Sequence, residues 1–402
     1  MHLSETTKKF IRDHAGDKLP ELLLSASRYP GVNVKEAVVQ IKARNRIRDK
    51  LPSWYRDDRL YFPSTLAVEQ CSSELTAMYK QRFVQVADWV CDLTGGLGVD
   101  SYFFAQKASR VTYVEREEAY CDAARNNFQF LKANPVEIIH ADAIELVANS
   151  DERIAGVDVF YLDPDRRGTG NKRLFAISDC EPDLTKIISL LQKQCRLIVK
   201  LSPMLDITQA LSQIPNVREV HIVSVKNDCK EVLIISGGLM QLTQTDPVIY
   251  CVNYTTDGTE QPFRFRLSEE YAADITFAKD NGRYLYEPNA SILKAGAYKS
   301  IALQYNVAKL HASSHLYTSD RLITPFPGRI FEITEIIPFS SRICKSLYKN
   351  IPQAHVAVRN FPLSVAELRK RTKIADGGTV YLFATTLSDN RKALIQCRKH
   401  DK

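Results

Sequence analysis

Between Val86 and Ser236, short runs of apolar residues alternate with segments in which apolar residues recur every three or four positions. This alternation is typical of a parallel sheet whose strands are joined by amphipathic helices. We expect seven strands, at residues 86–93, 110–115, 136–141, 157–162, 195–201, 220–225 and 231–236. Only five residues separate the last two, too few for a parallel crossover, so these two strands must form a hairpin. The predicted fold is α/β, Rossmann-like, with a parallel sheet that has one antiparallel strand near its end.

The segments on either side have different patterns. Residues 1–82 are typical of helices, with one expected over residues 34–50 after an Asn33 cap and another over residues 72–82. Beyond residue 240 the chain is α+β: residues 247–270 alternate like strands, and Ser364 with Glu367 forms a capping box for a helix over 365–374. We therefore divide the chain into a helical region (1–82), the α/β domain (83–240), an α+β domain that a ferredoxin-like fold would fit (241–325) and a C-terminal domain (326–402).

Composition excludes several classes of protein. The chain has 402 residues, 45% of them hydrophobic, and contains no apolar run of the 18 or more residues that a membrane span needs. Its first residues lack the apolar core of a signal peptide, so we expect a cytoplasmic protein without a membrane partner. The nine cysteines form no C-x-x-C pair and no histidines cluster at metal-binding spacing, which predicts reduced thiols and no metal site.

Charge is distributed unevenly along the chain. The net charge of +7 combines +5 over residues 1–85, −5 over 86–240, −1 over 241–325 and +8 over 326–402. Basic ends around an acidic centre could hold a polyanion, and solvated basic helices would give the same numbers. Both interpretations also apply to the helix expected over 34–50, whose basic residues are spread around its axis, and to the basic run after Ser364, which contains Arg369, Lys370, Arg371 and Lys373.

Acidic residues stand at the ends of the first four expected strands: Asp92, Glu115, Asp142 and Asp163. The carboxyl ends of parallel strands meet at one edge of a sheet, where α/β proteins bind ligands. At that edge Glu115 could accept hydrogen bonds from both ribose hydroxyls, and Asp142 could accept one from an adenine amino group. Taken singly, each acid has a structural explanation, such as Asp142 capping the helix that begins at Ala143. Together they predict a site for a nucleoside cofactor.

The glycine loop after the first strand narrows the choice of cofactor. Gly95, Gly96 and Gly98 allow a sharp turn and a close approach of the backbone to a ligand. Their spacing differs from the G-x-G-x-x-G of dinucleotide sites, and no P-loop lysine follows. A pyrophosphate would lie poorly beside Asp92 and Asp100, whereas a cationic sulfonium is compatible with both carboxylates.

At this point the sequence resembles a known family. Asp92-Leu93-Thr94-Gly95-Gly96-Leu97-Gly98, Glu115, Asp142 and Asp163-Pro164 are similar to the ordered motifs of class I S-adenosylmethionine-dependent methyltransferases, and the expected terminal hairpin fits that fold. Further segments are similar to a bacterial group of these enzymes that carries a THUMP-like C-terminal domain. These segments are Leu66–Glu74, Glu287–Ala290, Arg359–Ser364 and Asp376–Gly378.

The resemblance implies S-adenosylmethionine as the cofactor and a role for each motif residue. The methionine end would be held by Asp92, Thr94, Gly95, Gly96 and Gly98, the ribose by Glu115, and the adenine by Asp142 and Ala143. Asp163 would line the methyl-transfer site. Because THUMP domains belong to RNA-modifying enzymes, the resemblance also implies an RNA partner, with tRNA favoured over rRNA.

The residues after the fourth strand bear on the chemistry. Asp163-Pro164-Asp165-Arg166 departs from the Asn/Asp-Pro-Pro-aromatic motif of amine methylation, because Asp165 replaces the second proline and Arg166 the aromatic residue. It also resembles uracil C5-methyltransferases, but Ser202 stands where those enzymes need a cysteine nucleophile. Direct in-line transfer remains, with Asp163 or Asp165 accepting a hydrogen bond from the acceptor.

Other interpretations stay open. Arg166 and Arg167 could hold a phosphate or form salt bridges with Asp165 or Asp179. The acceptor could be a protein or a small molecule, the chain could be an RNA-binding protein with a degenerate methyltransferase domain, and a dinucleotide oxidoreductase is the most distant alternative.

Overall fold

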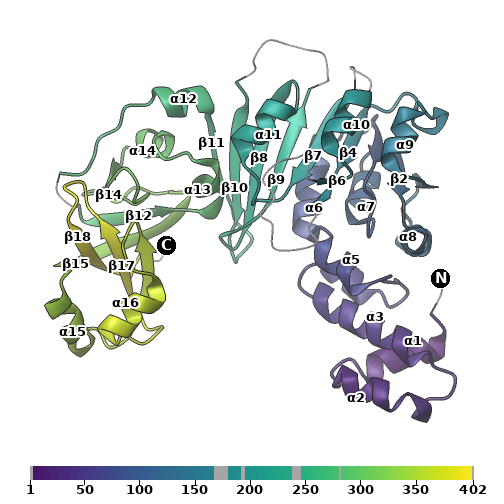
Figure 1. Ribbon diagram of the computed structural model, residues 1–402, viewed down its shortest axis with the longest axis horizontal. Helices are drawn as coiled ribbons and strands as arrows, with labels where there is room; N and C mark the ends of the chain where they lie inside the picture. The colour runs from purple at the N-terminus through teal and green to yellow at the C-terminus, as the bar shows by residue number, and fades with distance from the viewer. Residues whose placement is uncertain (1–2, 167–179, 192–194, 238–245, 280–281, 401–402) are drawn as a thin grey trace. The chain divides into compact units, whose positions relative to one another are not determined.

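The computed structural model describes residues 3–166, 180–191, 195–237, 246–279 and 282–400, and of Arg166 only the backbone. Figure 1 shows the arrangement of the helices and strands. The chain forms two compact units, one comprising Met1–Arg218 and Leu233–Thr245 and the other Glu219–Val232 and Asp246–Lys402. The boundary between the units falls inside two strands, β8 (Val217–Val225) and β9 (Asp228–Ser236).

The first unit begins with helices, drawn in purple in Figure 1: α1 (Glu5–Asp13), α2 (Leu19–Leu24), α3 (Val34–Ile47), α4 (Pro52–Arg56), α5 (Thr65–Gln70) and α6 (Glu74–Lys80). α3 starts as expected, with the Asn33 side chain accepting from Glu36 N, and ends three residues earlier than predicted. The helix predicted over 72–82 begins later, because Ser73 caps α6 by accepting from Thr76 N.

The basic residues of α3 and its C-terminal turn differ in their surroundings. Arg44 is buried and donates hydrogen bonds to the backbone carbonyls of Asp57, Asp58 and Leu60. Lys50 donates to two further backbone carbonyls, those of Val68 and Glu69. These two cations are therefore used within the fold, and the phosphate-contacting interpretation stays a prediction for the exposed Lys42, Arg46 and Arg48.

The sheet of the first unit has the predicted topology. Its parallel strands are β1 (Trp89–Asp92), β2 (Arg110–Glu115), β3 (Val136–His140), β4 (Val159–Leu162) and β7 (Arg196–Leu201). The strand order is β7-β4-β1-β2-β3, with β9 beside β7. The predicted start of the first strand, Val86, is wrong: Val86 is exposed, and the Asp88 side chain accepts from Gln85 N in a turn before β1.

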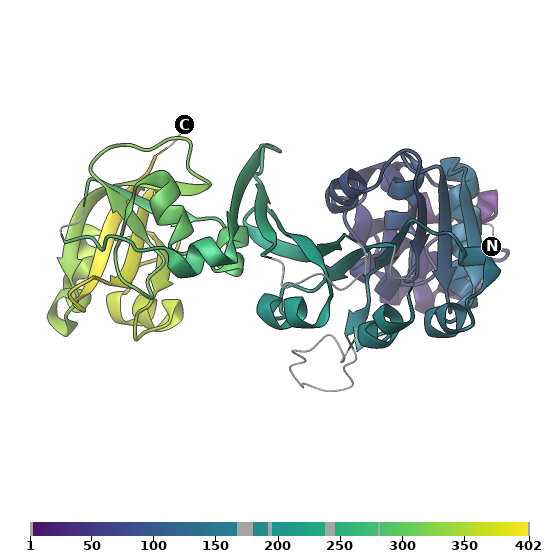
Figure 2. The ribbon, with the colours of Figure 1, turned by 90° about the horizontal axis from the view of Figure 1, so that it is seen from above.

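Helices cover both faces of this sheet. In right-handed crossovers, the direction in which the chain moves across the sheet decides which face the connecting helix covers. The chain moves in one direction from β1 to β2 and β3, so α7 (Val99–Ala105) and α8 (Glu118–Leu131) lie on one face; it then returns in the other direction from β3 to β4 and β7. The other face carries α9 (Ala143–Ala148), α10 (Leu184–Leu190) and α11 (Ile207–Gln213), which Figure 2 shows in a row in teal. The carboxyl ends of β1, β2 and β4 therefore meet at one edge.

The predicted hairpin is confirmed and is tighter than expected. β8 and β9 are neighbours in the sheet, joined by Lys226 and Asn227, which both have a positive φ (53° and 62°). Two such residues form a type I′ turn, whose twist suits antiparallel strands.

The second unit extends β8 and adds a separate sheet. β10 (Val248–Tyr254) pairs in parallel with β8 and antiparallel with β11 (Glu260–Arg266), so the strands expected over 247–270 are present. A seven-stranded sheet follows, made of β12 (Tyr284–Pro288), β13 (Ala308–Lys309), β14 (Tyr317–Ser319), β15 (Gly328–Pro338), β16 (His355–Arg359), β17 (Val380–Thr386) and β18 (Lys392–Lys399). Its helices are α12 (Leu267–Ala272), α13 (Ala290–Ala295), α14 (Ser300–Tyr305), α15 (Ser341–Asn350) and α16 (Val365–Thr372). The predicted capping box of Ser364 and Glu367 starts α16.

Candidate active site

The glycine loop after β1 is fixed by close packing. Gly95 N donates to Val114 O on β2, and a Cβ added at Gly95 would lie 2.3 Å from the ring of Tyr113. Gly98, with φ +81°, begins α7, and a Cβ there would lie 2.7 Å from Phe128. A Cβ at Gly96, by contrast, would meet only Thr94 O at 3.8 Å. The loop is thus packed against the sheet at Gly95 and Gly98 and open at Gly96.

Glu115, at the end of β2, contacts this loop directly. Its Oε2 accepts a hydrogen bond from Gly96 N at 2.8 Å, and its Oε1 accepts one from Glu117 N at 2.9 Å. The Tyr113 hydroxyl donates to Gly96 O at 2.7 Å from the same strand. The structure therefore brings together the loop and the acid that the sequence analysis placed in one site.

Asp92 is a buried carboxylate, 1% exposed, at the end of β1. Its oxygens accept hydrogen bonds from Thr94 N at 3.0 Å and from the Ser101 hydroxyl at 2.6 Å. Burial raises the pKa of Asp92 to about 7, because these hydrogen bonds offset only part of the desolvation of the charged form. Asp92 forms no ion pair with another described residue.

Asp142 and Ala143 follow β3. One Asp142 oxygen accepts from Ile144 N at 2.8 Å and from Glu145 N at 3.1 Å, which makes Asp142 the cap of α9. The structural explanation that the sequence offered for Asp142 is thus present. Its second oxygen forms no hydrogen bond with another described residue, so the cap leaves it available to a ligand.

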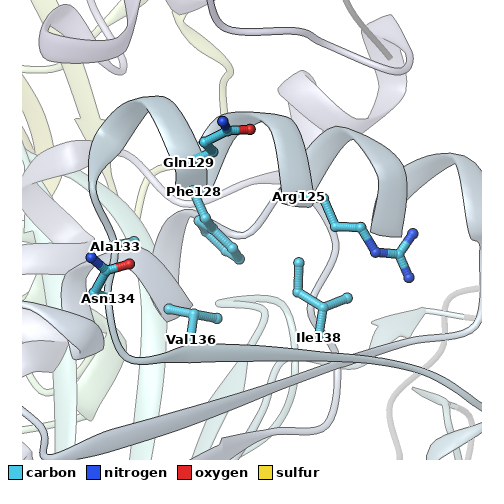
Figure 3. Close-up of a pocket in the computed structure, with 7 residues that line it drawn as sticks. All are labelled: Arg125, Phe128, Gln129, Ala133, Asn134, Val136 and Ile138. Carbon is cyan, nitrogen blue, oxygen red and sulfur yellow. The ribbon is translucent and has the colours of Figure 1, made fainter.

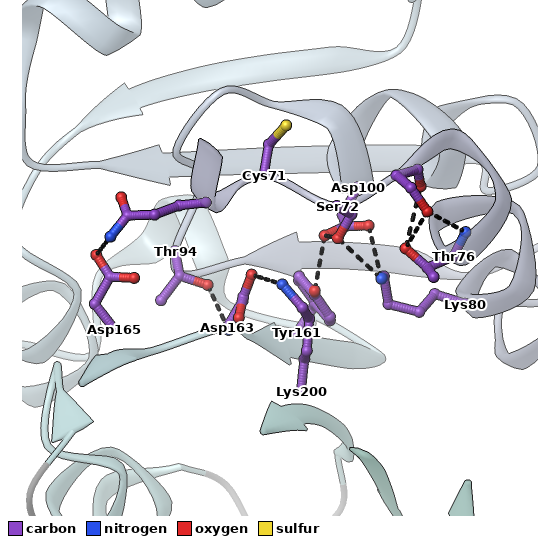
Figure 4. Close-up of polar contacts among 12 residues, drawn as sticks. Cys71, Ser72, Thr76, Lys80, Thr94, Asp100, Tyr161, Asp163, Asp165 and Lys200 are labelled. Carbon is purple, nitrogen blue, oxygen red and sulfur yellow. Dashed lines mark hydrogen bonds and ion pairs between the residues drawn. The ribbon is translucent and has the colours of Figure 1, made fainter. Parts of the chain in front are cut away.

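Asp163 is held at two points after β4. Its backbone N–H donates to the Thr94 hydroxyl at 2.7 Å, and its Oδ2 is paired with the ammonium group of Lys200 on β7. Figure 4 shows the two side chains directed at each other. The pair is mostly buried, with 13% of the Lys200 side chain and 28% of the Asp163 side chain exposed.

Of the other predicted catalytic residues, Pro164 is half-buried and Asp165 is exposed. Asp165 accepts a hydrogen bond from the side chain of Gln70 on α5 at 3.3 Å, and desolvation with the nearby Asp163 charge raises the pKa of Asp165. The backbone of Arg166 lies in β5 (Asp165–Arg166), which pairs with β6 (Cys180–Glu181). The Arg166 side chain, Arg167 and Asp179 lie outside the described residues, so the phosphate and salt-bridge interpretations stay predictions.

Asp100, which the sequence analysis put beside the ligand, is engaged in a buried polar network that sequence reasoning missed. Asp100 on α7 accepts from the Ser72 hydroxyl at 2.7 Å and the Tyr161 hydroxyl at 2.8 Å, and forms an ion pair with Lys80 at 3.2 Å. Burial would raise the pKa of Asp100, but the charges of Lys80 and Lys200 and the two hydrogen bonds outweigh it and lower that pKa. Lys80 is 0% exposed.

One signal could have found Lys200. It interrupts the apolar run of β7, and a charged residue inside a buried strand needs a partner.

A cavity of about 350 Å³ lies elsewhere, between α8 and β3 (Figure 3). It is lined by Arg125, Phe128, Gln129, Ala133, Asn134, Val136 and Ile138. None of these lining residues is a predicted site residue, although Phe128 also lies beside Gly98 of the glycine loop.

Some kinds of site are absent from the described part of the chain. Among those residues no group of three His, Cys, Asp or Glu side chains is arranged to hold a metal ion. No described helix is both long and apolar enough to cross a membrane.

A strand order of this kind, with a glycine loop after the first strand and acids after the next three, defines a Rossmann-like class I methyltransferase domain. Comparison with known proteins supports the same class of protein. The crystal structure of a candidate methyltransferase from Porphyromonas gingivalis W83 is 36% identical in sequence over 100% of both chains, with a TM-score of 0.86. Family models for a ferredoxin-like domain and a THUMP domain-like region match residues 284–327 and 328–399.

A protein of Mycoplasma mobile named as an uncharacterized RNA methyltransferase is 33% identical over 108 residues. That match takes in 27% of this chain and 28% of the relative, so the chain spans less than a third of the relative's length. The chain belongs to the bacterial class I S-adenosylmethionine-dependent methyltransferases that carry a THUMP-like C-terminal domain.

Proposed function

We propose that this methyltransferase binds S-adenosylmethionine at the edge formed by the carboxyl ends of β1, β2, β3 and β4 and transfers its methyl group to RNA. The observation that carries the proposal is the contact between the glycine loop and Glu115, from Gly96 N to Oε2 at 2.8 Å. It places the Glu115 carboxylate beside Gly96, whose side toward a ligand is open.

The residues present fit this cofactor. Asp92 is buried and forms no ion pair with a described residue, so a cationic ligand group would supply the opposite charge that it lacks. Both Glu115 oxygens accept one hydrogen bond and keep capacity for a second, as two ribose hydroxyls require.

In this proposal each predicted residue keeps its expected role. The methionine end lies against Asp92, Thr94, Gly95, Gly96 and Gly98, the ribose against Glu115, and the adenine against Asp142 and Ala143. Pro164, Asp165 and Arg166 line the acceptor side with Asp163.

The mechanism then rests on orientation. The bound sulfonium supplies an electrophilic methyl group. Asp163 is fixed at its backbone by Thr94 and at its side chain by Lys200, so it can hold an acceptor N–H or O–H in line. Its Oδ1 forms no hydrogen bond with another described residue and is available for that contact.

A basic surface on the second unit supports an RNA acceptor. We call it the basic face; it consists of Arg342, Lys345 and Lys349 on α15, Lys370 and Arg371 on α16, and Lys373 after α16. All six are exposed, and none forms an ion pair with another described residue. Lys373 lies 5.9 Å from the ring of Tyr348 on α15, which brings the two helices' charges together. Unpaired cations at this density favour a polyanion.

The direct test is transfer of labelled methyl groups from S-adenosylmethionine to total RNA from cells that lack this enzyme. We expect label that stays with the RNA and is lost on ribonuclease treatment. Cofactor binding in calorimetry without RNA labelling would contradict the RNA acceptor, and absence of cofactor binding would contradict the proposal as a whole. Enzymatic digestion of the labelled RNA followed by mass spectrometry would then identify the nucleoside, and fractionation would separate tRNA from rRNA.

A further inference from the structure

Lys200 is placed unusually for a cation. It lies on the fifth parallel strand of the sheet, between Leu197, Ile198 and Val199 on one side and Leu201 on the other, all of which are buried. Only 13% of its side chain is exposed. Burying an ammonium group costs several kcal/mol of desolvation, so the position requires opposite charge nearby.

That charge comes from the reacting edge of the site. The Lys200 ammonium group is paired with Asp163 Oδ2, the pairing drawn in Figure 4. Burial raises the pKa of Asp165 overall, and the charge of Lys200 opposes that rise. The charges of Lys80 and Lys200 lower the pKa of Asp100 against its desolvation. One cation therefore acts on three carboxylates, those of Asp163, Asp165 and Asp100.

The groups around Lys200 come from several elements. They are Asp163 after β4, Asp165 in β5, Asp100 in α7 with its partner Lys80 in α6, and Cys71 after α5, whose pKa Lys200 also lowers against a larger effect of burial. Among the described residues the ion-pair partner of Asp163 is Lys200, whereas that of Asp100 is Lys80. The loss of Lys200 would therefore act mainly on Asp163.

We propose that Lys200 is a positioning residue for methyl transfer: it holds one oxygen of Asp163 and thereby leaves the other directed to the acceptor group. This inference rests on the proposed function. The ammonium group fixes the rotamer of Asp163, so that Oδ1 accepts the acceptor's hydrogen bond and takes up its proton as the methyl group is transferred. Lys200 itself touches neither cofactor nor acceptor.

The experiment compares Lys200→Met with Lys200→Arg and with a matched control, Lys230→Met, which removes an exposed Lys–Asp pair on β9. Methyl transfer to the RNA described above and cofactor binding by calorimetry are measured from pH 6 to 9. We expect Lys200→Met to lower kcat about 100-fold, as for the loss of an acid–base group. The KM for the cofactor and the affinity of the enzyme for it should stay within a factor of about two, because the substitution removes no contact with the bound cofactor.

The pH profile separates positioning from a merely structural role. The charge of Lys200 opposes the rise in the pKa of Asp165, so this pKa should rise further in Lys200→Met. Asp163 loses its ion-pair partner in the same variant. The acid limb of the Lys200→Met profile should therefore move to higher pH, with part of the activity regained at pH 9. In Lys200→Arg the acid limb should stay at the same pH as in the wild type, and most of kcat should be retained. A Lys200→Met enzyme with wild-type kcat, or one whose profile is unshifted, overturns the inference.

A second measurement does not depend on the acceptor. The melting temperatures of Lys200→Met, Asp163→Asn and the double variant form a cycle in which the double variant should lose less than the sum of the two single losses. Additive losses would show that the two side chains do not interact and would overturn the inference. If the wild type labels no RNA, the proposed function fails on its own, and this cycle still decides whether Lys200 holds Asp163.

Discussion

The sheet edge of the first unit and the basic face of the second unit use charge in opposite ways. At the sheet edge, Asp92, Asp100 and Lys80 are almost fully buried, and each has specific hydrogen bonds or an ion pair. On the basic face, six cations are exposed and form no ion pair with another described residue. Buried charges depend on exact geometry, whereas exposed charges act additively on a distant polyanion. Single substitutions should therefore be severe in one region and mild in the other.

The largest effect is expected at Lys80. Lys80→Met leaves Asp100 buried without its ion-pair partner, and the free energy of unfolding should fall by about 3–5 kcal/mol. Urea denaturation of variant and wild type measures it. The control is Lys18→Met, which breaks an exposed pair with Glu21 and should cost about 0–1 kcal/mol. Equal losses in the two variants would mean that burial does not distinguish these charges.

Substitution of Asp92 should affect cofactor binding and stability in different ways. Asp92→Asn removes the carboxylate proposed to face the cofactor, and cofactor affinity should fall by about 1.5–3 kcal/mol in calorimetry. Stability should respond differently. The folded pKa of Asp92, about 7, lies above its usual 3.8, so its contribution to stability is complete below pH 4 and is lost as the pH rises through 7. The difference between the melting temperatures of Asp92→Asn and the wild type should therefore change in favour of the variant as the pH rises from 5 to 8. A constant difference across that range would contradict the burial of an ionisable Asp92.

Glu115 should matter mainly for cofactor binding. Glu115→Ala removes two hydrogen bonds to backbone N–H groups and the proposed ribose contacts, and should weaken cofactor binding by about 1–3 kcal/mol. The matched control is Glu118→Ala, an exposed acid in the first turn of α8. If Glu115→Ala binds the cofactor as tightly as the wild type in calorimetry, the proposed contact between Glu115 and the ribose is contradicted.

The smallest effect per residue is expected on the basic face. Replacing all six of its cations with Gln should weaken RNA binding and flatten the slope of log K against log salt. The slope should change by about 0.9 for each duplex phosphate that the variant no longer neutralises, or by about 0.7 for each single-stranded one. Filter binding at several salt concentrations measures it, and cofactor affinity should not change. The control is Arg283→Gln with Arg391→Gln, because both arginines are exposed but paired with acids. A variant that binds RNA as the wild type does would show that this face is merely solvated.

Arg369 is left out of that variant, although the sequence grouped it with Lys370, Arg371 and Lys373. Its guanidinium donates to the backbone carbonyls of Ile374 and Ala354 and pairs with Asp376. Sequence reasoning could count the cations of this helix, but which of them the fold uses internally depends on the turn that follows the helix and on Ala354, just before β16.

Much of the first unit could be predicted because its signals are local. The five parallel strands and the hairpin followed from apolar runs and the length of the connection, and the glycine loop begins three residues after Asp92. Lys200 and Gln70 could not be paired with their partners in this way. They contact Asp163 and Asp165 from positions 37 and 95 residues away, and no local pattern encodes such a distance.

The buried carboxylate of Asp92 has one more consequence. Near neutral pH it is ionised in only part of the molecules, whereas a cationic ligand would require the ionised form. Under the proposed role, loading the cofactor would expel a proton into the buffer. The heat of binding should then differ between phosphate and Tris, whose ionisation enthalpies differ, so a calorimeter would register the enzyme's own acid–base change before any methyl group has moved.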